Sequence, residues 1–208
     1  MPNEEVKKQN INKALETACG CFLEHGIEMV TMEMISRESG ISRASLGRYF
    51  SGKKDLVFQT ITWIGRTYRE GLEKRGLLKK GNGLNGLQRL RLFMEYTKLL
   101  YLEDPRAFIL RAEFKIFVYR NIENGAAEGE RLIEDLEFRS VLRKIYAEGI
   151  ADGSMVEGID IEQETKFFCE AYFGFFADSA SSGQEDRKYV SDKIDRYIKR
   201  VLNSYKRV

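Results

Sequence analysis

The sequence is poor in residues that interrupt helices or cross-link a chain. It has two prolines among 208 residues, and proline is the strongest helix breaker. Its three cysteines, an odd number, provide no disulfide framework for a chain of this length. Cys19 and Cys21 would lie about 200° apart around a helix, so they do not suggest a shared metal ion. The composition favours a helical protein of a reducing compartment, with no metal site.

Signatures of catalysis and of membrane insertion are also scarce. His25 is the only histidine, so catalytic triads and histidine-based metal sites have little to draw on. No uncharged apolar run approaches the ~18 residues of a membrane span. The N-terminus MPNEEVKKQNINK lacks the apolar core of a signal peptide. We expect a cytoplasmic protein that is not an enzyme and holds no cofactor, with catalysis by paired carboxylates left as an alternative.

The net charge of +2 is close to neutral, but the charges are unevenly distributed. Residues 43–80 carry ten Lys and Arg against three Asp and Glu, so this region is +7 and the remainder is −5. This asymmetry predicts one basic end on a mildly acidic body. A basic region alone is often a solvated surface, so a nucleic-acid interpretation depends on where the charges lie.

The segment from Thr31 to Lys54 predicts two short helices joined by a glycine turn. Thr31 is a suitable N-cap for the first helix, and Gly40 suits the left-handed conformation that ends it. Ser42 provides a second N-cap two residues later. Four apolar side chains can pack the two helices together: Met32, Ile35, Ile41 and Leu46. The arrangement is a helix-turn-helix, whose second helix enters the major groove of DNA.

Apolar periodicity predicts an all-α chain of about nine helices. A first helix from Val6 to His25 would end at Gly26 and complete a three-helix domain over residues 1–52. Residues 53–208 would form a larger helical domain. Its helices are expected at about 53–80, 87–103, 105–120, 130–152, 161–181 and 184–206, with loops at 79–86 and 121–129.

The stretch 167–177 is apolar nearly all round, since only Glu170 is charged and six of its eleven residues are aromatic. Such a helix must be covered on more than one side. The last helix adds another broad apolar face. Together they predict a four-helix interface with a second copy of the chain, through residues of about 160–206. The alternative is that both helices belong simply to the core.

From Ala14 to Leu56 the chain resembles the tetracycline-repressor (TetR) family of bacterial transcription regulators. The matching pattern is a first helix with Phe22 and Gly26, then T-M-x-x-I-S-x-x-S-G-I-S, S-L-G-R-Y-F and S-G-K-K-D-L. The resemblance implies a ligand-responsive repressor with an effector-binding and dimerisation domain over residues 53–208. It also implies a homodimer that binds a palindromic double-stranded DNA operator and an unidentified small-molecule effector.

Three positions depart from the family pattern. Ser36 and Ser39 stand where the family usually has alanine. Gly47 stands where the family most often has a tyrosine that touches the DNA backbone. Glycine inside a helix costs roughly 0.5 to 1 kcal/mol relative to alanine. Because Gly47 has no side chain to make that contact, an alternative function stays open: a helical dimer that binds a small molecule or a protein and has weak or no DNA binding.

Eight residues are predicted to contact DNA. Arg43 is the first choice for reading a base, because its guanidinium can bond guanine O6 and N7 together. Ala44 is placed to contact a thymine methyl group, and Ser45 to bond a base or a phosphate. The predicted set is Thr31, Ser42, Arg43, Ala44, Ser45, Arg48, Tyr49 and Lys53.

Lys53 and its neighbour Lys54 begin a helix, where cations oppose the helix dipole. A DNA phosphate at that terminus would reverse the balance, since free N–H groups, dipole and lysine would all face it. The alternative is a pair of solvated surface lysines.

Aromatic residues on successive helices of the body predict either an apolar ligand cavity or a filled core, and a filled core is the more frequent outcome. Arg111 lies in the apolar stretch AFILRAEFKIFVY and is a candidate for a polar contact to a ligand or for an internal ion pair. Ligand binding would favour an arrangement whose two recognition helices no longer match major grooves about 34 to 36 Å apart. The predicted ligand-binding set is Phe93, Tyr96, Phe108, Arg111, Phe114, Tyr146, Phe168 and Tyr172.

Overall fold

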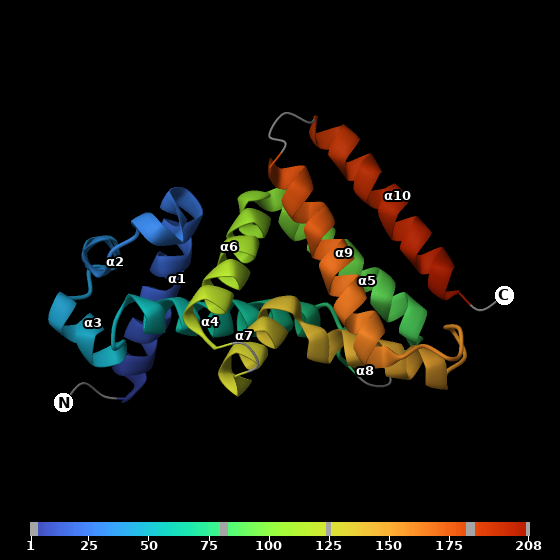
Figure 1. Ribbon diagram of the computed structural model, residues 1–208, viewed down its shortest axis with the longest axis horizontal. Coiled ribbons are helices and arrows are strands. Elements are labelled where there is room, and N and C mark those ends of the chain that lie inside the picture. The colour runs from blue at the N-terminus through green and yellow to red at the C-terminus, as the bar shows by residue number, and fades with distance from the viewer. Residues whose placement is uncertain (1–3, 80–82, 124–125, 182–185, 207–208) are drawn as a thin grey trace. The chain divides into compact units, whose positions relative to one another are not determined.

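The computed structural model describes residues 4–79, 83–123, 126–181 and 186–206. Within these ranges the chain forms ten helices and no strand, which confirms the predicted all-α class (Figure 1). The helices are α1 (Glu4–Met29), α2 (Met32–Ser39), α3 (Arg43–Tyr49), α4 (Lys53–Lys74), α5 (Gly86–Glu103), α6 (Arg106–Asn121), α7 (Ala127–Glu137), α8 (Arg139–Ala151), α9 (Ile161–Ser181) and α10 (Arg187–Tyr205). None of the helices in the described ranges is long and apolar enough to cross a membrane.

The helices pack into two compact units, each with its own hydrophobic core. The first unit consists of Met1–Thr67 and Leu110–Leu136, and the second of Tyr68–Ile109 and Glu137–Val208. This division by packing differs from the boundary predicted after residue 52, because α4 and α6 contribute residues to both units. The division into domains 1–52 and 53–208 stays a prediction.

In the first unit, α1 buries Leu15, Ala18 and Phe22, which recur at helical spacing along the chain. The helix breaks at Gly26, where the sequence pattern predicted its end. The φ of 75° and ψ of 158° at this residue belong to a region that essentially only glycine adopts. The chain can therefore turn toward Thr31 and begin α2.

The helix-turn-helix forms as its capping residues predicted. The Thr31 hydroxyl accepts a hydrogen bond of 3.2 Å from the N–H of Met34, and α2 ends at Gly40 with φ 68°. The Ser42 hydroxyl accepts the N–H of Ser45 at 3.2 Å and begins α3. Of the four packing residues, Ile35, Ile41 and Leu46 are buried and Met32 is half-buried.

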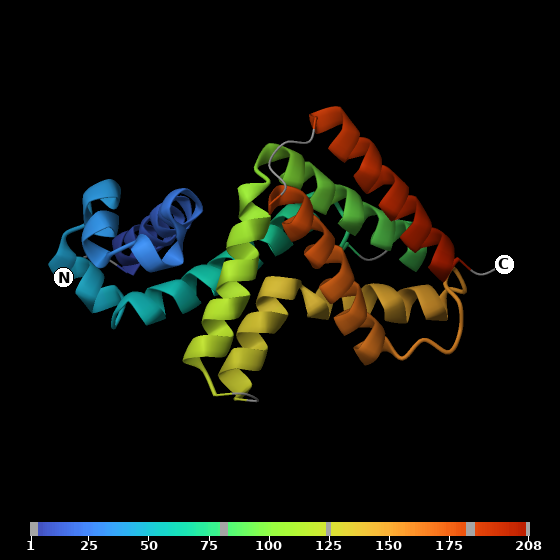
Figure 2. The same cartoon turned by 45° about the horizontal axis from the view of Figure 1, so that its top comes forward.

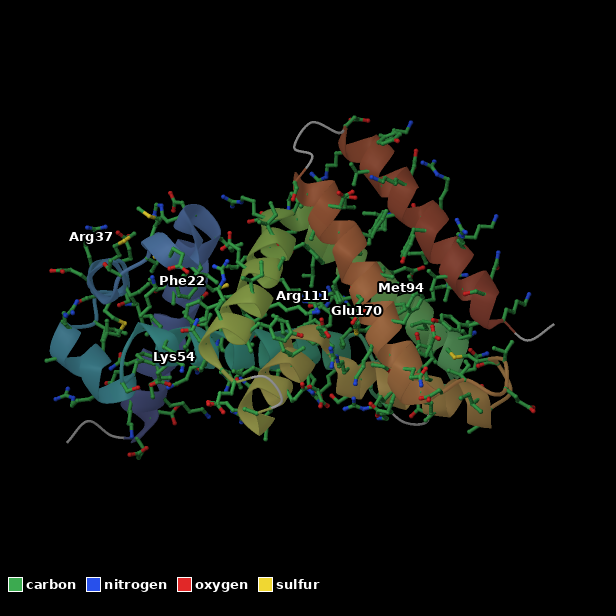
Figure 3. The ribbon with its side chains drawn as sticks, in the orientation of Figure 1. Phe22, Arg37, Lys54, Met94, Arg111 and Glu170 are labelled. Atoms are coloured by element: carbon green, nitrogen blue, oxygen red, sulfur yellow. The ribbon has the colours of Figure 1, made fainter. Side chains whose placement is uncertain are left out.

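The first three helices do not complete this core alone. Phe114 on α6 meets Phe22 edge to face, with ring centroids 5.9 Å apart, and Phe117 meets Phe58 at 6.0 Å. Figure 3 shows Phe22 in the interior of this unit. Three more buried side chains come from α7: Leu132, Ile133 and Leu136. The core beneath the helix-turn-helix thus includes residues from well beyond the predicted domain boundary.

In the second unit, α5 packs against both α8 and α10, and the run of α10 beside α5 is visible in Figures 1 and 2. The crossing of α5 and α8 is a backbone contact, because a Cβ on Gly86 would lie 2.2 Å from the Cα of Gly149. The loop after α8 also caps α5. Asp152 accepts the N–H of Gly86 at 2.7 Å, and Ser154 accepts the N–H of Leu87 at 3.1 Å.

Arg89 on α5 is a buried cation of this unit, with 7% of its surface exposed. Its Nε lies 3.1 Å from a carboxylate oxygen of Glu148 on α8. Its guanidinium also donates to the carbonyls of Leu77 and Lys79 after α4. A buried guanidinium needs such partners, and the bonds connect three segments at one end of the unit.

Three predicted boundaries need correction or qualification. The expected helix 130–152 is two helices, α7 and α8, because Phe138 between them adopts a left-handed conformation with φ 54°. Its ring stacks on Tyr68 at 3.8 Å, and no glycine or proline marks the break. The helix expected to reach about Lys80 ends at Lys74, since a turn at Gly76 follows. Lys80, the expected start of the last helix at 184, and parts of both predicted loops lie outside the described residues.

Gly26 and Gly20 offer a matched test of the break in α1. Replacing Gly26 with alanine should lower the free energy of unfolding by about 1 to 3 kcal/mol, because alanine tolerates the observed φ and ψ poorly. Gly20→Ala should raise it by about 0.5 to 1 kcal/mol, since Gly20 lies within α1 and a Cβ there meets nothing within 4 Å. Urea unfolding of both variants measures the two changes in free energy of unfolding. Equal changes would show that the backbone conformation at Gly26 does not require glycine.

Candidate nucleic-acid interface

The outer side of α3 carries most of the predicted contact residues. Leu46 is buried and fixes the helix against the core, while Ser42, Arg43 and Ala44 are exposed. Ser45 is half-buried between these two sides. The start of α3 therefore faces solvent, as a helix that enters a DNA groove must.

The polar groups on this side differ in how they are engaged. The Ser45 hydroxyl accepts hydrogen bonds from Arg48 at 2.9 Å and from the Ser42 hydroxyl at 3.0 Å. Within the described residues, Arg43 has no hydrogen-bond or ion-pair partner, so its guanidinium is available to an external acceptor. Arg43 is therefore the candidate on α3 for a hydrogen bond to the edge of a DNA base.

Thr31 and Tyr49, two other residues predicted to contact DNA, also have partners within the protein. Thr31 is exposed, with its hydroxyl oxygen capping α2. Tyr49 is half-buried, and its hydroxyl lies 3.5 Å from the side-chain nitrogen of Asn10 on α1. Both positions leave a hydroxyl near the surface of the helix-turn-helix.

The lysine pair at the start of α4 is arranged differently from the sequence interpretation. The Lys53 ammonium donates to the carbonyl of Glu28 at 2.7 Å, and Lys54 donates to the carbonyl of Asn121 at 2.8 Å. Both acceptors lie at the C-terminal ends of helices, where cations are favourable. The N-terminus of α4 already has an anion, since Asp55 accepts the N–H of Ser51 at 2.8 Å. Lys53 and Lys54 thus each have a hydrogen-bond partner within the protein, without a phosphate. Lys54 is labelled in Figure 3.

Helices α4 and α6 hold the segment that runs from the break at Gly26 to the start of α2. Besides the Lys53 bond to Glu28, Glu113 on α6 accepts the N–H of Ile27 at 3.4 Å. Neither contact could be predicted from the sequence, because each joins residues far apart in the chain and has no local signal.

The eight predicted ligand-binding residues are divided between the two units. Six belong to the core of the second unit, whereas Arg111 and Phe114 belong to the first. Arg111 donates to the carbonyl of Leu136 at 2.8 Å. The six in the second unit are Phe93, Tyr96, Phe108, Tyr146, Phe168 and Tyr172.

These rings contact one another. Phe168 lies 6.2 Å from Phe93 and 5.0 Å from Tyr172 between ring centroids. The Tyr172 hydroxyl donates to the carbonyl of Met94 at 2.8 Å, and that of Tyr146 donates to Tyr205 at 3.1 Å. Burial raises the pKa of the Tyr172 and Tyr146 phenols well above the usual value.

Residues 81–86 have the spacing G-x-G-x-x-G, which is typical of dinucleotide-binding loops when it follows a strand and opens a helix. The preceding element here is the helix α4, and the described residues contain no strand. Residues 81 and 82 lie outside the described ranges. The motif therefore lacks the strand that gives it meaning, and it does not point to a dinucleotide enzyme.

Residues 14–60, which include the whole helix-turn-helix, match the family model of bacterial regulatory proteins, tetR family. This segment is thus similar to the DNA-binding part of tetR-family proteins. The proteins that this model describes are bacterial regulators, so the expectation of a regulator rather than an enzyme is confirmed. No curated protein matches the sequence.

Solved structures share the fold of this regulator across nearly its whole length. A TetR-family transcriptional regulator from Agrobacterium tumefaciens has a TM-score of 0.72 and 18% identity, covering 97% of this chain and all of that one. The fatty acid degradation regulator FadR from Bacillus halodurans has a TM-score of 0.71 and 11% identity, covering 89% and 96% of the two chains. FadR from Bacillus subtilis, solved in complex with stearoyl-CoA, has a TM-score of 0.68 and 15% identity, covering 92% and 97%.

Gly47 is exposed on α3, and a Cβ there would meet nothing within 4 Å. Gly47→Ala in this regulator should therefore raise the free energy of unfolding by about 0.5 to 1 kcal/mol and leave DNA affinity unchanged. Urea unfolding and DNA titration test the two parts. A loss of DNA affinity above about tenfold, or 1.4 kcal/mol, would show that the backbone at Gly47 approaches the DNA closely.

Proposed function

We propose that this regulator is a ligand-responsive repressor that binds a palindromic operator as a homodimer in the cytoplasm, where it meets chromosomal DNA. The observation that supports DNA reading best is the exposed start of α3, where Arg43 has no internal partner among the described residues. Arg43 reads a guanine, and the rest of the predicted set positions the protein on the backbone.

Lys53 contacts a phosphate in this proposal, although its ammonium is bonded to the carbonyl of Glu28 in the free protein. An ammonium has three donors, so one can remain on the carbonyl while another faces a phosphate. Lys53 therefore serves both the turn before Thr31 and the DNA backbone.

The exposed face of α9 supports a homodimer. Phe167 is 65% exposed, and Ala171, Gly174 and Asp178 follow it on the same side of the helix. A Cβ on Gly174 would meet nothing within 4 Å, so this side is open in one protomer. Small residues beside one large ring suit close packing of a second α9. Together with α10, whose Tyr189 is 52% exposed, α9 forms the proposed four-helix interface.

A small molecule relieves repression in this proposal. Two structures of the same fold suggest an apolar or amphipathic effector: the FadR complex with stearoyl-CoA, and the ketosteroid regulator KstR2 of Mycobacterium tuberculosis, at 16% identity and a TM-score of 0.58. The predicted aromatic residues of the second unit are the candidate lining. Because their rings pack on one another in the described structure, the effector must displace some of them.

A second candidate function is a helical dimer that binds a ligand or a protein and has weak DNA binding. It is favoured by Gly47, which leaves no side chain at a position where the family has a tyrosine. Selection of bound fragments from random DNA by the purified protein distinguishes the two. A recovered palindrome supports the repressor, whereas no enrichment at low salt supports the second candidate.

Arg43 and Lys53 should respond differently to substitution. Arg43→Ala should weaken operator binding and relax the preference at one base pair, at a cost of about 1 to 3 kcal/mol in discrimination. Lys53→Ala should weaken all sequences alike and lower the slope of log affinity against log salt by about 1. Salt titrations on operator and random DNA measure both. Equal losses on the two DNAs for Arg43→Ala would exclude it from base reading.

Phe167 provides a test of the dimer. Phe167→Asp should convert the protein to monomers at micromolar concentration, because it replaces an aromatic ring of the proposed four-helix interface with a buried, unpaired charge. Leu99→Asp is the control, since Leu99 is 55% exposed on α5, outside the proposed interface. Sedimentation equilibrium measures the mass of each variant. A Phe167→Asp protein that stays dimeric would show that α9 is not at the interface.

A further inference from the structure

A groove of about 670 Å³ lies within the first unit, between the N-terminal half of α1, the helix α4 and the start of α7. This volume is within the range of small-molecule sites in proteins. None of the residues predicted to contact DNA or the effector lines it. The groove is therefore separate from both sites proposed above.

The floor of the groove is apolar. Leu15, Phe58 and Leu132, one from each helix, are buried at its base, and Ile11 and Trp63 beside them are half-buried. Trp63 is the single tryptophan of the chain. A flat ring and branched aliphatic side chains of this kind suit the apolar body of a ligand.

Several polar groups at the rim already have internal partners. Asp55 accepts hydrogen bonds from Ser51 and, at 2.9 Å, from Gln59. Arg66 donates to the side-chain oxygen of Asn12 at 3.0 Å. At the open end, Glu4 and Lys7 form an ion pair at 4.0 Å, and Glu5 is also engaged.

The remaining rim charges are two cations and one carboxylate. Lys8 on α1 and Arg131 and Glu128 on α7 line the groove, and none of their side chains has a hydrogen bond or ion pair within the part of the chain that the structure describes. Over the whole lining four cations balance four carboxylates, so Lys8 and Arg131 favour an anion by their position and not by an excess of positive charge. An anion would find two available cations there, on different helices.

We propose that this groove binds a small amphipathic anion. Its apolar body lies on Phe58, Trp63 and Leu132, and its carboxylate or phosphate head lies at the rim with Lys8 and Arg131. Such a ligand contacts α1, α4 and α7 together, so it stabilises the first unit in the described conformation. This second site acts on the unit that carries α3, whereas the proposed effector acts on the second unit.

The position of Trp63 allows a direct test without a label. The full-length protein is titrated with decanoate below its micellar concentration, and tryptophan emission is followed. Decanoate should change the emission saturably, whereas decyltrimethylammonium and decanol, which share the chain but carry a positive or no charge, should bind more weakly. Decyl phosphate shows whether a phosphate head is preferred to a carboxylate.

Arg131→Gln should weaken decanoate binding by about fivefold, the upper value for a solvent-exposed ion pair. Arg120→Gln is the matched control, because Arg120 is an exposed arginine of the same unit that does not line the groove. Thr62→Phe, at an exposed position of α4 that does line the groove, should weaken binding by filling it.

Three results would overturn the proposal: equal binding of the anionic and cationic amphiphiles, an unchanged affinity in Arg131→Gln, or no effect of Thr62→Phe. Circular dichroism establishes that each variant is folded. Operator binding without amphiphile, measured on the same samples, should match the unsubstituted protein. It keeps a failure of this site distinct from a failure of DNA binding.

Discussion

The contact between Phe22 and Phe114 is the constraint on which the DNA-binding unit depends. It joins the first helix to α6 in the interior of one core, edge to face at 5.9 Å. The core of a three-helix domain of about 50 residues is marginal alone. The core beneath α3 therefore takes side chains from α6 and α7, and the recognition helix rests on segments that lie far along the sequence.

Helices α4 and α6 also hold the segment that leads into α2. Glu113 on α6 accepts the N–H of Ile27, and Lys53 on α4 donates to the carbonyl of Glu28. Lys54 joins the two helices directly, since it donates to the carbonyl of Asn121 at the end of α6. Because α4 and α6 are continuous helices with residues in both cores, a displacement of either bears directly on these bonds. Under the proposed mechanism, an effector in the second unit changes DNA binding through such contacts rather than by touching α3.

Much of the fold could be predicted because its signals are local. Helical periodicity and the scarcity of proline indicated an all-α chain, and most helix boundaries followed from it. The break at Phe138 could not be predicted, since the residue is held in a left-handed conformation by packing on Tyr68 and not by its own preference. The aromatic residues showed the same limit. Their spacing indicated burial, but only packing separated Phe114 from Tyr172 into different cores.

The sequence by itself determined the helix-turn-helix. Thr31, Gly40 and Ser42 act on backbone groups within four residues of themselves, so their effect is set by order along the chain. Only the tertiary structure decided where Lys53 and Lys54 direct their charge, and which cations around Trp63 have no internal partner among the described residues. Those outcomes depend on groups that distant helices bring together, and a hydrogen bond or an apolar contact across such a distance leaves no periodic mark in the sequence.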